Sequence, residues 1–390
     1  MRIVKEMRDD MLYFDHGATS YPKPERVMKG ALRAMESFGA NPGRSGHQLA
    51  LKASREIFDA RETVAKFFNI KDPKQVIFTS NCTESLNLGI KGVLNKGDHV
   101  ITTSMEHNSV LRPIKALENE GVENTIIACN QDGSLPLEKI DQSIQENTKL
   151  IVLTHSSNLT GTLMPVTEVG KLARERGILF LVDAAQTAGL YPIDVEKMCI
   201  DLLAAPGHKG LLGPQGTGFL YIKEGLRLKT LKEGGTGSKS QDLIQPDIFP
   251  DRYESGTPNT PGIVGLKEGI EYILEKGREN LLDHEESLVK YFLEEMSTLD
   301  FIEIYGPKDC KKQSAVVALN FRDMDSSEIA YILDSMFDIA VRPGLHCAPL
   351  AHKTMGTIEQ GAVRFSFGYS TTLEEVKKAV TAIKSIGAEL

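Results

Sequence analysis

An aspartate and a lysine, 26 positions apart, are the residues of this sequence best suited to act together chemically. Asp183 ends the apolar run 178–182, and Lys209 stands in the small-residue segment 207–210. Such a run predicts a buried strand of a parallel sheet, and ligands of open α/β sheets bind beyond the carboxyl ends of the strands. Pyridoxal phosphate needs a lysine for its Schiff base and a carboxylate that keeps its ring nitrogen protonated. The pair therefore predicts a site for this cofactor, although a lone lysine is ordinarily solvated and a lone aspartate ordinarily caps a helix or turn.

A second predicted strand could supply the phosphate end of such a site. Residues 75–79, with an apolar centre at 76–78, predict a strand that runs into a helix start at 80–88 rich in hydroxyl and amide side chains. The first turn of a helix offers unpaired N–H groups and the positive end of its dipole, which suit a dianionic phosphate. An ordinary N-cap would have the same residues, so this segment supports the cofactor site only in combination with the others.

Further polar side chains follow predicted strands. His107 comes after the strand 98–103, where an imidazole could stack on a ring or move protons, although a lone histidine there is more often structural. Asn158 follows the strand 149–154, and Gln186 lies three residues after the aspartate already named. Because the carboxyl ends of parallel strands meet at one edge of a sheet, these side chains are expected to share one pocket.

The order and spacing of short motifs place the sequence near a known family. The matching segments are 15–19, 41–47, 105–107, 157–162, 182–186, 207–209, 213–218, 254–259 and 341–348. Together they resemble the class V branch of fold-type I pyridoxal-phosphate enzymes, specifically the cysteine desulfurase and selenocysteine lyase family. The resemblance covers nearly the whole chain and is closest to the second group of that family, which has a short active-site cysteine loop.

The resemblance implies a role for each matched cofactor residue. Lys209 would form the Schiff base with pyridoxal 5′-phosphate, Asp183 would pair with the ring nitrogen, and His107 would stack on the ring. The other cofactor contacts that it implies are Gln186 at the phenolic oxygen, Cys82, Thr83 and His208 at the phosphate, and Thr257 at the phosphate of the neighbouring subunit in a homodimer.

The resemblance also implies how the substrate is held. Asn158, Arg342 and Arg364 would position L-cysteine or L-selenocysteine. Arg364 would grip the carboxylate in the bidentate geometry that guanidinium groups favour.

Cys347 separates the possible reaction types. The five cysteines form no CxxC pair and have an odd count, which indicates a reduced compartment. Cys347 lies in a Gly/Pro loop beside Arg342 and His346, neighbours that would favour a reactive thiolate. The resemblance implies that this thiolate attacks the sulfur of the substrate and carries a persulfide. A zinc cluster of His346, Cys347 and His352 is the alternative, but its spacing fits no common structural zinc pattern, and no metal is expected.

Two positions depart from the family pattern. Leu345 stands where the family has the first histidine of a pair, so one polar neighbour of the thiol is lost. Pro206 stands where a serine or threonine commonly helps to bind the phosphate, and it offers neither a hydroxyl nor an N–H.

Alternating strands and helices predict an α/β fold with a mostly parallel sheet flanked by helices. The resemblance implies the fold-type I architecture, with seven strands in that sheet. It also implies a large domain over 16–258 and a small α+β domain made of 1–15 and 259–390. Within the small domain the pattern predicts a long helical stretch that follows 261–262 and runs through about 297, with Glu285 on its solvated face, strands at 315–321 and 362–367, and a last helix over 372–386.

Composition excludes several other classes. The chain has 390 residues, 41% hydrophobic content and a formal net charge of −8, which are normal values for a soluble acidic protein. We find no basic stripe for nucleic acid, no 18-residue apolar run for a membrane, and no apolar signal core near the N-terminus. A cytoplasmic location is expected.

The predicted function is a pyridoxal-phosphate cysteine desulfurase that converts L-cysteine to L-alanine, with the persulfide on Cys347. An acceptor protein would then take the sulfur or selenium. Selenocysteine lyase and class V aminotransferase activity are the enzymatic alternatives. A non-enzymatic scaffold would have lost Lys209 or Asp183, and both are present.

Overall fold

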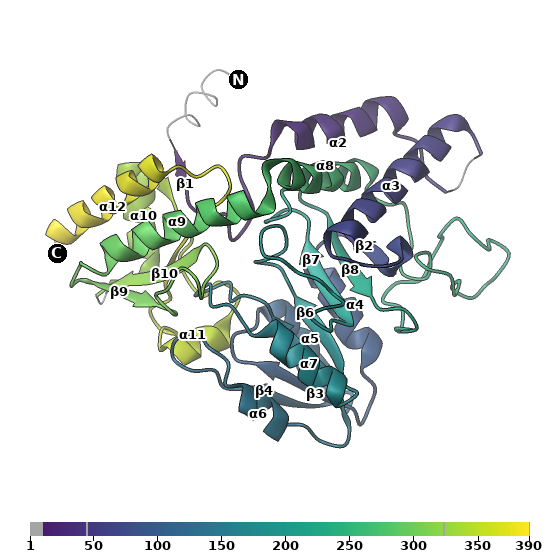
Figure 1. The fold of residues 1–390 in the computed structure, drawn as a ribbon, viewed down its shortest axis with the longest axis horizontal. Helices are drawn as coiled ribbons and strands as arrows, with labels where there is room; N and C mark the ends of the chain where they lie inside the picture. Colours follow the sequence, from purple (N-terminus) through teal and green to yellow (C-terminus); the bar gives the residue numbers. More distant parts are fainter. Residues whose placement is uncertain (1–10, 44–45, 323, 390) are drawn as a thin grey trace.

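The computed structural model describes residues 11–43, 46–322 and 324–389, so the motif residues Arg44 and Ser45 and positions 1–10 of the predicted small domain lie outside the described residues. A seven-stranded sheet with the order β2-β8-β7-β6-β5-β3-β4 forms the centre of the larger part (Figure 1). Only β8 runs antiparallel to its neighbours. The strands are β2 (Val76–Thr79), β3 (His99–Thr103), β4 (Glu123–Ile127), β5 (Thr148–Thr154), β6 (Leu179–Asp183), β7 (Leu202–Pro206) and β8 (Gly218–Ile222).

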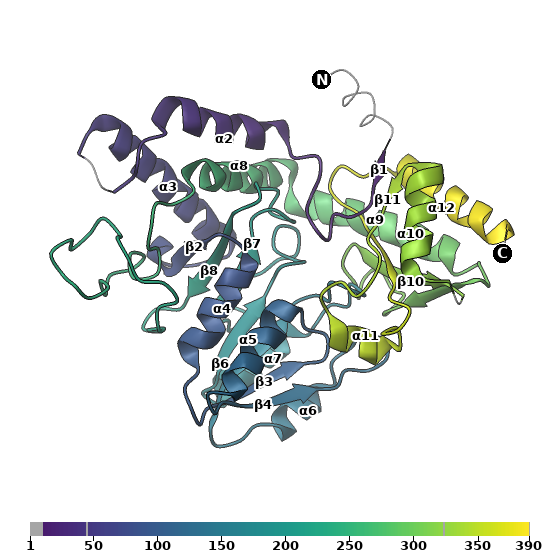
Figure 2. The same ribbon diagram turned by 180° about the vertical axis from the view of Figure 1, so that it is seen from behind.

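Helices cover both faces of this sheet because the central strands are apolar on both sides. In β6, Phe180 and Val182 join one buried cluster and Leu181 joins the other. The first cluster includes α3 (Gln48–Phe67), α7 (Val166–Glu175) and α8 (Thr260–Lys276). The second includes α4 (Cys82–Val93) and α5 (Asn108–Glu118). These two helices cover the face of the sheet that is turned toward the viewer in Figure 2. This arrangement confirms the predicted mostly parallel seven-stranded sheet flanked by helices.

The smaller part is built on a second sheet. Its antiparallel strands, in the order β12-β10-β9, are β9 (Ile302–Tyr305), β10 (Val316–Phe321) and β12 (Val363–Ser366). Their apolar side chains form one cluster with α9 (Arg278–Met296), α10 (Ser326–Phe337) and α12 (Leu373–Ala388). A short parallel pair, β1 (Leu12–Tyr13) with β11 (Ile339–Ala340), joins the start of the described chain to this part.

The helical stretch predicted after 261–262 and through about 297 is divided into α8 and α9. Gly277 separates the two helices with a φ of 84°, a left-handed conformation that glycine adopts without a steric penalty. Helix α8 packs against α2 (Glu25–Phe38), and its buried residues Ile263 and Ile270 join the core of the large sheet (Figure 1). The domain division stays a prediction, and this packing favours a boundary near Gly277 over one after residue 258.

The remaining helices are short: α6 (Leu137–Gln142), α11 (Pro349–Met355) and the single 3₁₀ turn η1 (Pro73–Gln75). Within the described ranges, none of the helices combines the length and the apolar character needed to cross a membrane.

Candidate active site

The strand ends of the large sheet meet around one cavity of about 190 Å³. Asp183 is the last residue of β6 and pairs in register with Thr154, the last residue of β5, while Lys209 follows shortly after the end of β7. The cavity is lined by most of the predicted cofactor and substrate residues: Cys82, Thr83, His107, Asn158, Asp183, Gln186, His208 and Lys209.

Asp183 is a buried carboxylate at the floor of this site. Its Oδ1 accepts a hydrogen bond from the amide of Ala185 at 2.9 Å and one from the thiol of Cys82 at 3.5 Å. Burial raises the pKa of Asp183, while the Ala185 amide and Lys209 oppose this shift. Burial also raises the pKa of the Cys82 thiol well above its ordinary value, so Cys82 is a neutral donor and not a nucleophile.

Lys209 is an unusually acidic lysine. Burial and the positive charge of Arg364 lower its pKa to about 8, and Asp183 only partly offsets them. Near neutral pH, Lys209 is therefore a neutral amine in a larger fraction of the molecules than a solvated lysine would be.

His107 caps α5 and is bonded to the start of α4 through a serine. Its Nδ1 accepts the amide of Ser109 at 3.0 Å, and the Ser109 hydroxyl lies 2.9 Å from that nitrogen and 2.8 Å from the Thr83 hydroxyl. Burial and nearby cations, with Lys209 first among them, lower the pKa of His107 to about 4, so the ring is neutral. Sequence reasoning missed Ser109, although a serine two positions after a capping histidine is a signal for such a contact.

A segment near the N-terminus braces the loop that carries Lys209. The carbonyl of His208 accepts hydrogen bonds from Lys23 Nζ at 2.6 Å and from the Ser20 amide at 3.1 Å. The His208 ring lies 3.1 Å from the Thr19 hydroxyl, and burial lowers its pKa to about 4. Gln186 is held by the same segment, because its Nε2 donates to the carbonyl of Gly17 at 3.1 Å.

Arg364 enters from the smaller part of the molecule and is fully buried. Its Nη2 pairs with Asp15 Oδ1 at 2.6 Å, and its Nη1 donates to the carbonyl of Asn158 at 3.0 Å. Arg364 Nε and Asn158 Oδ1 are buried without a hydrogen-bond partner. A buried polar atom without a partner costs free energy, so both atoms are suited to a bound ligand. Asp15 belongs to a motif that the sequence matched, but its pairing with Arg364 was not foreseen.

The Cys347 loop is attached to the wall of the same cavity. The carbonyl of His346 accepts from Asn158 Nδ2 at 2.6 Å, and the carbonyl of Cys347 accepts from the amide of Asn108, next to His107, at 2.7 Å. The thiol of Cys347 is exposed, and the Arg342 guanidinium lies 3.8 Å from it. The loop therefore presents an accessible sulfur beside a cation.

The histidines of the zinc alternative bond to each other. His346 Nδ1 and His352 Nε2 are 3.2 Å apart. Among the residues that the structure describes, no group of three or more His, Cys, Asp or Glu side chains is arranged to hold a metal ion.

Thr257 and Pro206, two residues singled out from the sequence, differ in their relation to the cavity. Thr257 is exposed and contacts Asn41 at 3.3 Å, and it does not line the cavity of its own chain. Pro206, the last residue of β7, lines the cavity without offering a donor.

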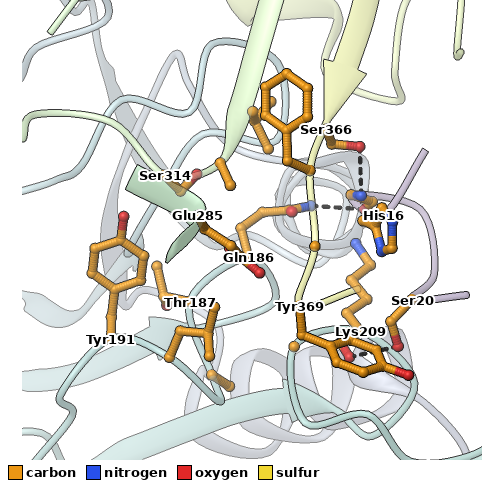
Figure 3. A pocket seen from close by; sticks show the side chains of 18 of the residues that line it. His16, Ser20, Gln186, Thr187, Tyr191, Lys209, Glu285, Ser314, Ser366 and Tyr369 are labelled. Atoms are coloured by element: carbon orange, nitrogen blue, oxygen red, sulfur yellow. Dashed lines mark hydrogen bonds between the residues drawn. The ribbon is translucent and has the colours of Figure 1, made fainter. Parts of the chain in front are cut away.

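A second, smaller cavity of about 50 Å³ adjoins the first, since Gln186 and Lys209 line both (Figure 3). Glu285 points into it from α9 and is half-buried, so it does not lie on the fully solvated face that the sequence predicted. Burial raises the pKa of Glu285 to about 8. His16 Nδ1 and Thr187 Oγ1 are buried there without partners, which suits this space to ordered water.

Comparison with known proteins agrees with this geometry. The family model described as aminotransferase class-V matches residues 12–379, and the chain belongs to that family. A probable cysteine desulfurase of Methanothermobacter thermautotrophicus is 35% identical over 97% of this chain and 96% of its own length. A cysteine desulfurase of an Enterobacter species is 33% identical over 98% and 95%. The solved apo structure of a cysteine desulfurase from Thermococcus onnurineus NA1 is similar with a TM-score of 0.92 and 35% identity, covering 100% of this chain and 99% of that chain.

Proposed function

We propose that this protein is a pyridoxal-5′-phosphate-dependent cysteine desulfurase, which converts L-cysteine to L-alanine and takes the sulfur onto Cys347. The observation that carries the proposal is the shared cavity of Lys209 and Asp183, with the Cys347 loop hydrogen-bonded to its wall. The names of the relatives reported above support the same activity.

The donor set of the cavity fits the cofactor. The first turn of α4, with the hydroxyls of Thr83 and Ser109, would hold the phosphate, and His208 would add to it. Asp183 would keep a proton on the ring nitrogen, and the neutral His107 would stack on the ring. When bound, pyridoxal phosphate supplies an electron-deficient ring that stabilises negative charge on the α-carbon of an amino acid attached to it.

Lys209 and Arg364 would act on the substrate. With a pKa of about 8, Lys209 has a neutral amine fraction that can remove the α-proton of the bound amino acid. The buried Arg364 would bind the substrate carboxylate through its unpartnered Nε and would share Nη2 between that carboxylate and Asp15. The bidentate grip that the resemblance implies is therefore proposed with Nε and Nη2 as its two donors.

Cys347 would then take the sulfur. Its thiolate, beside Arg342, attacks the Sγ atom of the substrate. The new S–S bond forms as the Cβ–Sγ bond breaks, the electron pair stays on the substrate, and protonation at Cβ gives the methyl group of alanine. Cys347 keeps the persulfide until a thiol reductant or an acceptor protein removes it.

Product analysis tests this function directly. Purified holoenzyme should form alanine from L-cysteine in amounts equal to the sulfur released with a thiol reductant, and the Cys347 peptide should gain the mass of one sulfur atom. The same enzyme is then given L-selenocysteine and, separately, an amino donor with a keto acid. Alanine from selenocysteine alone would favour the lyase alternative, and transamination without alanine formation from cysteine would favour the aminotransferase.

A homodimer with shared sites is the proposed assembly. Thr257 is exposed in its own chain, and on one side of α2 the apolar residues Met28, Leu32 and Met35 are exposed at helical spacing. A second copy would cover that stripe and receive Thr257 at its phosphate. Sedimentation should show a dimer, and Thr257→Asp should weaken cofactor retention by charge repulsion. A monomer with full activity would contradict this assembly.

A further inference from the structure

A short chain of buried hydrogen bonds lies behind the exposed Cys347. His346 Nδ1 is 3.2 Å from His352 Nε2, and the planes of the two rings lie within 6° of parallel. At one end of the chain His346 Nε2 lies 3.0 Å from the carbonyl of Arg342. At the other end His352 Nδ1 lies 2.8 Å from the Thr357 hydroxyl. The exposed fractions of His346, His352 and Thr357 are 2%, 0% and 3%, so water has little access to these bonds.

The ends of this chain fix the direction of every bond in it. A carbonyl can only accept, so His346 Nε2 carries a proton and donates to Arg342. Burial and Arg364 lower the pKa of His346 to about 2, and burial lowers that of His352 to about 4, so each ring is neutral and holds one proton. His346 Nδ1 then accepts from His352 Nε2, and His352 Nδ1 accepts from the hydroxyl of Thr357, whose other acceptor, the His352 carbonyl, is farther away at 3.5 Å.

The chain supports a loop whose backbone is strained. His346 and Cys347 have φ angles of 50° and 57°, so two adjacent residues with a Cβ atom adopt the left-handed conformation. Such a conformation persists only where the surroundings hold it. Two bonds hold the backbone carbonyls, from Asn158 and from the amide of Asn108. The His346 side chain is the third anchor, and its position depends on His352 and Thr357.

We propose that His352 and Thr357 are positioning residues for sulfur transfer, which act through His346 to hold Cys347 at the cavity. This inference rests on the proposed function. Both side chains are buried behind the loop, and neither is among the residues that line the cavity, so we place them outside direct contact with the cofactor and the amino acid. Helix α11 carries His352, and the amide of Thr357 donates to the carbonyl of His352 at 2.9 Å, so both residues belong to one small rigid unit.

A matched pair of substitutions at Thr357 tests this role in the holoenzyme. Thr357→Val removes the hydroxyl with little change in shape, and His352 Nδ1 is left without a donor. Hydrogen exchange of the amides in 344–348 should become about tenfold faster, and kcat for L-cysteine should fall by about the same factor, because a buried polar atom without a partner destabilises the local structure. KM and the cofactor absorbance should not change, because Arg364 and Lys209 keep their contacts. Thr357→Ser keeps the hydroxyl and should restore both values to within about twofold of the wild type.

Thr354→Val is the control on the same helix. It removes a hydroxyl whose hydrogen bonds run to Ser104 and to the carbonyl of Leu350, both at 2.9 Å, and not to the chain through His352. Amide exchange of 344–348 should stay at the wild-type rate in this variant. His352→Phe keeps a ring but breaks both of its bonds, and it replaces Thr357→Val if that variant does not fold.

The outcomes separate this role from general stability and from the proposed function. The inference is overturned if Thr357→Val keeps wild-type exchange and kcat, if Thr357→Ser behaves like Thr357→Val, or if the Thr354 control loosens the loop equally. If the wild-type enzyme forms neither alanine nor a persulfide from cysteine, the proposed function fails. The exchange measurements would still decide whether the chain positions Cys347.

Discussion

The cavity that contains Lys209 and the loop that carries Cys347 are stabilised by different kinds of contact. The cavity is formed where strands of one sheet end, and Asp183 lies in register with its neighbour on β5. The loop belongs to the smaller part, carries an exposed thiol, and has two adjacent residues with positive φ. The first region takes its geometry from the regular spacing of a sheet, whereas the second depends on a few particular hydrogen bonds.

This difference indicates how the two functions can be separated. Cofactor binding and proton removal are assigned to the sheet, and the choice of reaction is assigned to the loop. A change in the cavity should therefore remove every activity. A change in the loop should remove sulfur transfer and leave the cofactor in place.

The largest expected effect tests the cavity. Lys209→Ala should lower alanine formation by at least ~10³-fold, because both the covalent attachment and the base are lost. Borohydride reduction of the wild-type holoenzyme should fix the pyridoxyl group on the peptide of Lys209. Lys23→Met removes another lysine near the site, whose pKa burial lowers to about 8, and it should leave the label on Lys209. Labelling at any lysine other than 209 would refute the assignment.

The next effect tests the loop. Cys347→Ala should lower alanine and sulfur formation from L-cysteine together by ~10²-fold or more, because a covalent nucleophile is removed. The cofactor spectrum should be unchanged, and deselenation of selenocysteine could survive because selenium leaves more easily. Cys310→Ala, which alters a half-buried cysteine, should keep wild-type rates. Desulfuration of cysteine at the wild-type rate by the Cys347 variant would rule out the persulfide mechanism.

The contrast between the two regions also explains what the sequence could predict. Asp183, His107 and Asn158 follow runs that predict strands, so the carboxyl ends of these strands can be predicted from the local sequence. The convergence of these ends then follows from parallel pairing.

Contacts between distant segments could not be predicted in this way. Arg364 and Asp15 pair across 349 positions. The bond between His346 and His352 spans only six positions, but it depends on how α11 folds back onto the Cys347 loop, which no local pattern predicts. Gly277 interrupts a pattern that otherwise continues as one helix, because apolar periodicity does not register a single residue with positive φ. Glu285 was assigned to solvent since the cavity beside it forms only when α9 meets the larger part.

The pH dependence of kcat tests the role that is assigned to Lys209 in the cavity. A lysine is active as a base when it is neutral, and burial with Arg364 lowers the pKa of Lys209 to about 8. Below that pH, kcat should fall about tenfold per pH unit as the amine becomes protonated, and above it kcat should level off. The measurement is kcat with saturating L-cysteine between about pH 6 and 9, with the cofactor content checked at each pH. A profile that stays flat across this range would show that Lys209 does not limit the reaction as a base.

The smallest expected effect concerns Leu345, where the chain departs from its family. Its side chain is 42% exposed, whereas the neighbouring His346 is buried in the chain of bonds that holds the loop. Leu345→His should therefore change kcat by less than about threefold and leave the cofactor spectrum as it is, because exposed substitutions rarely alter stability by more than about 0.5 kcal/mol. The matched variant His346→Leu should lower kcat strongly, since it removes the anchor itself. If Leu345→His instead raised kcat more than about tenfold, an exposed imidazole would be the missing partner of the thiol, and the loop would owe its reactivity to surface chemistry and not to the buried hydrogen bonds behind it.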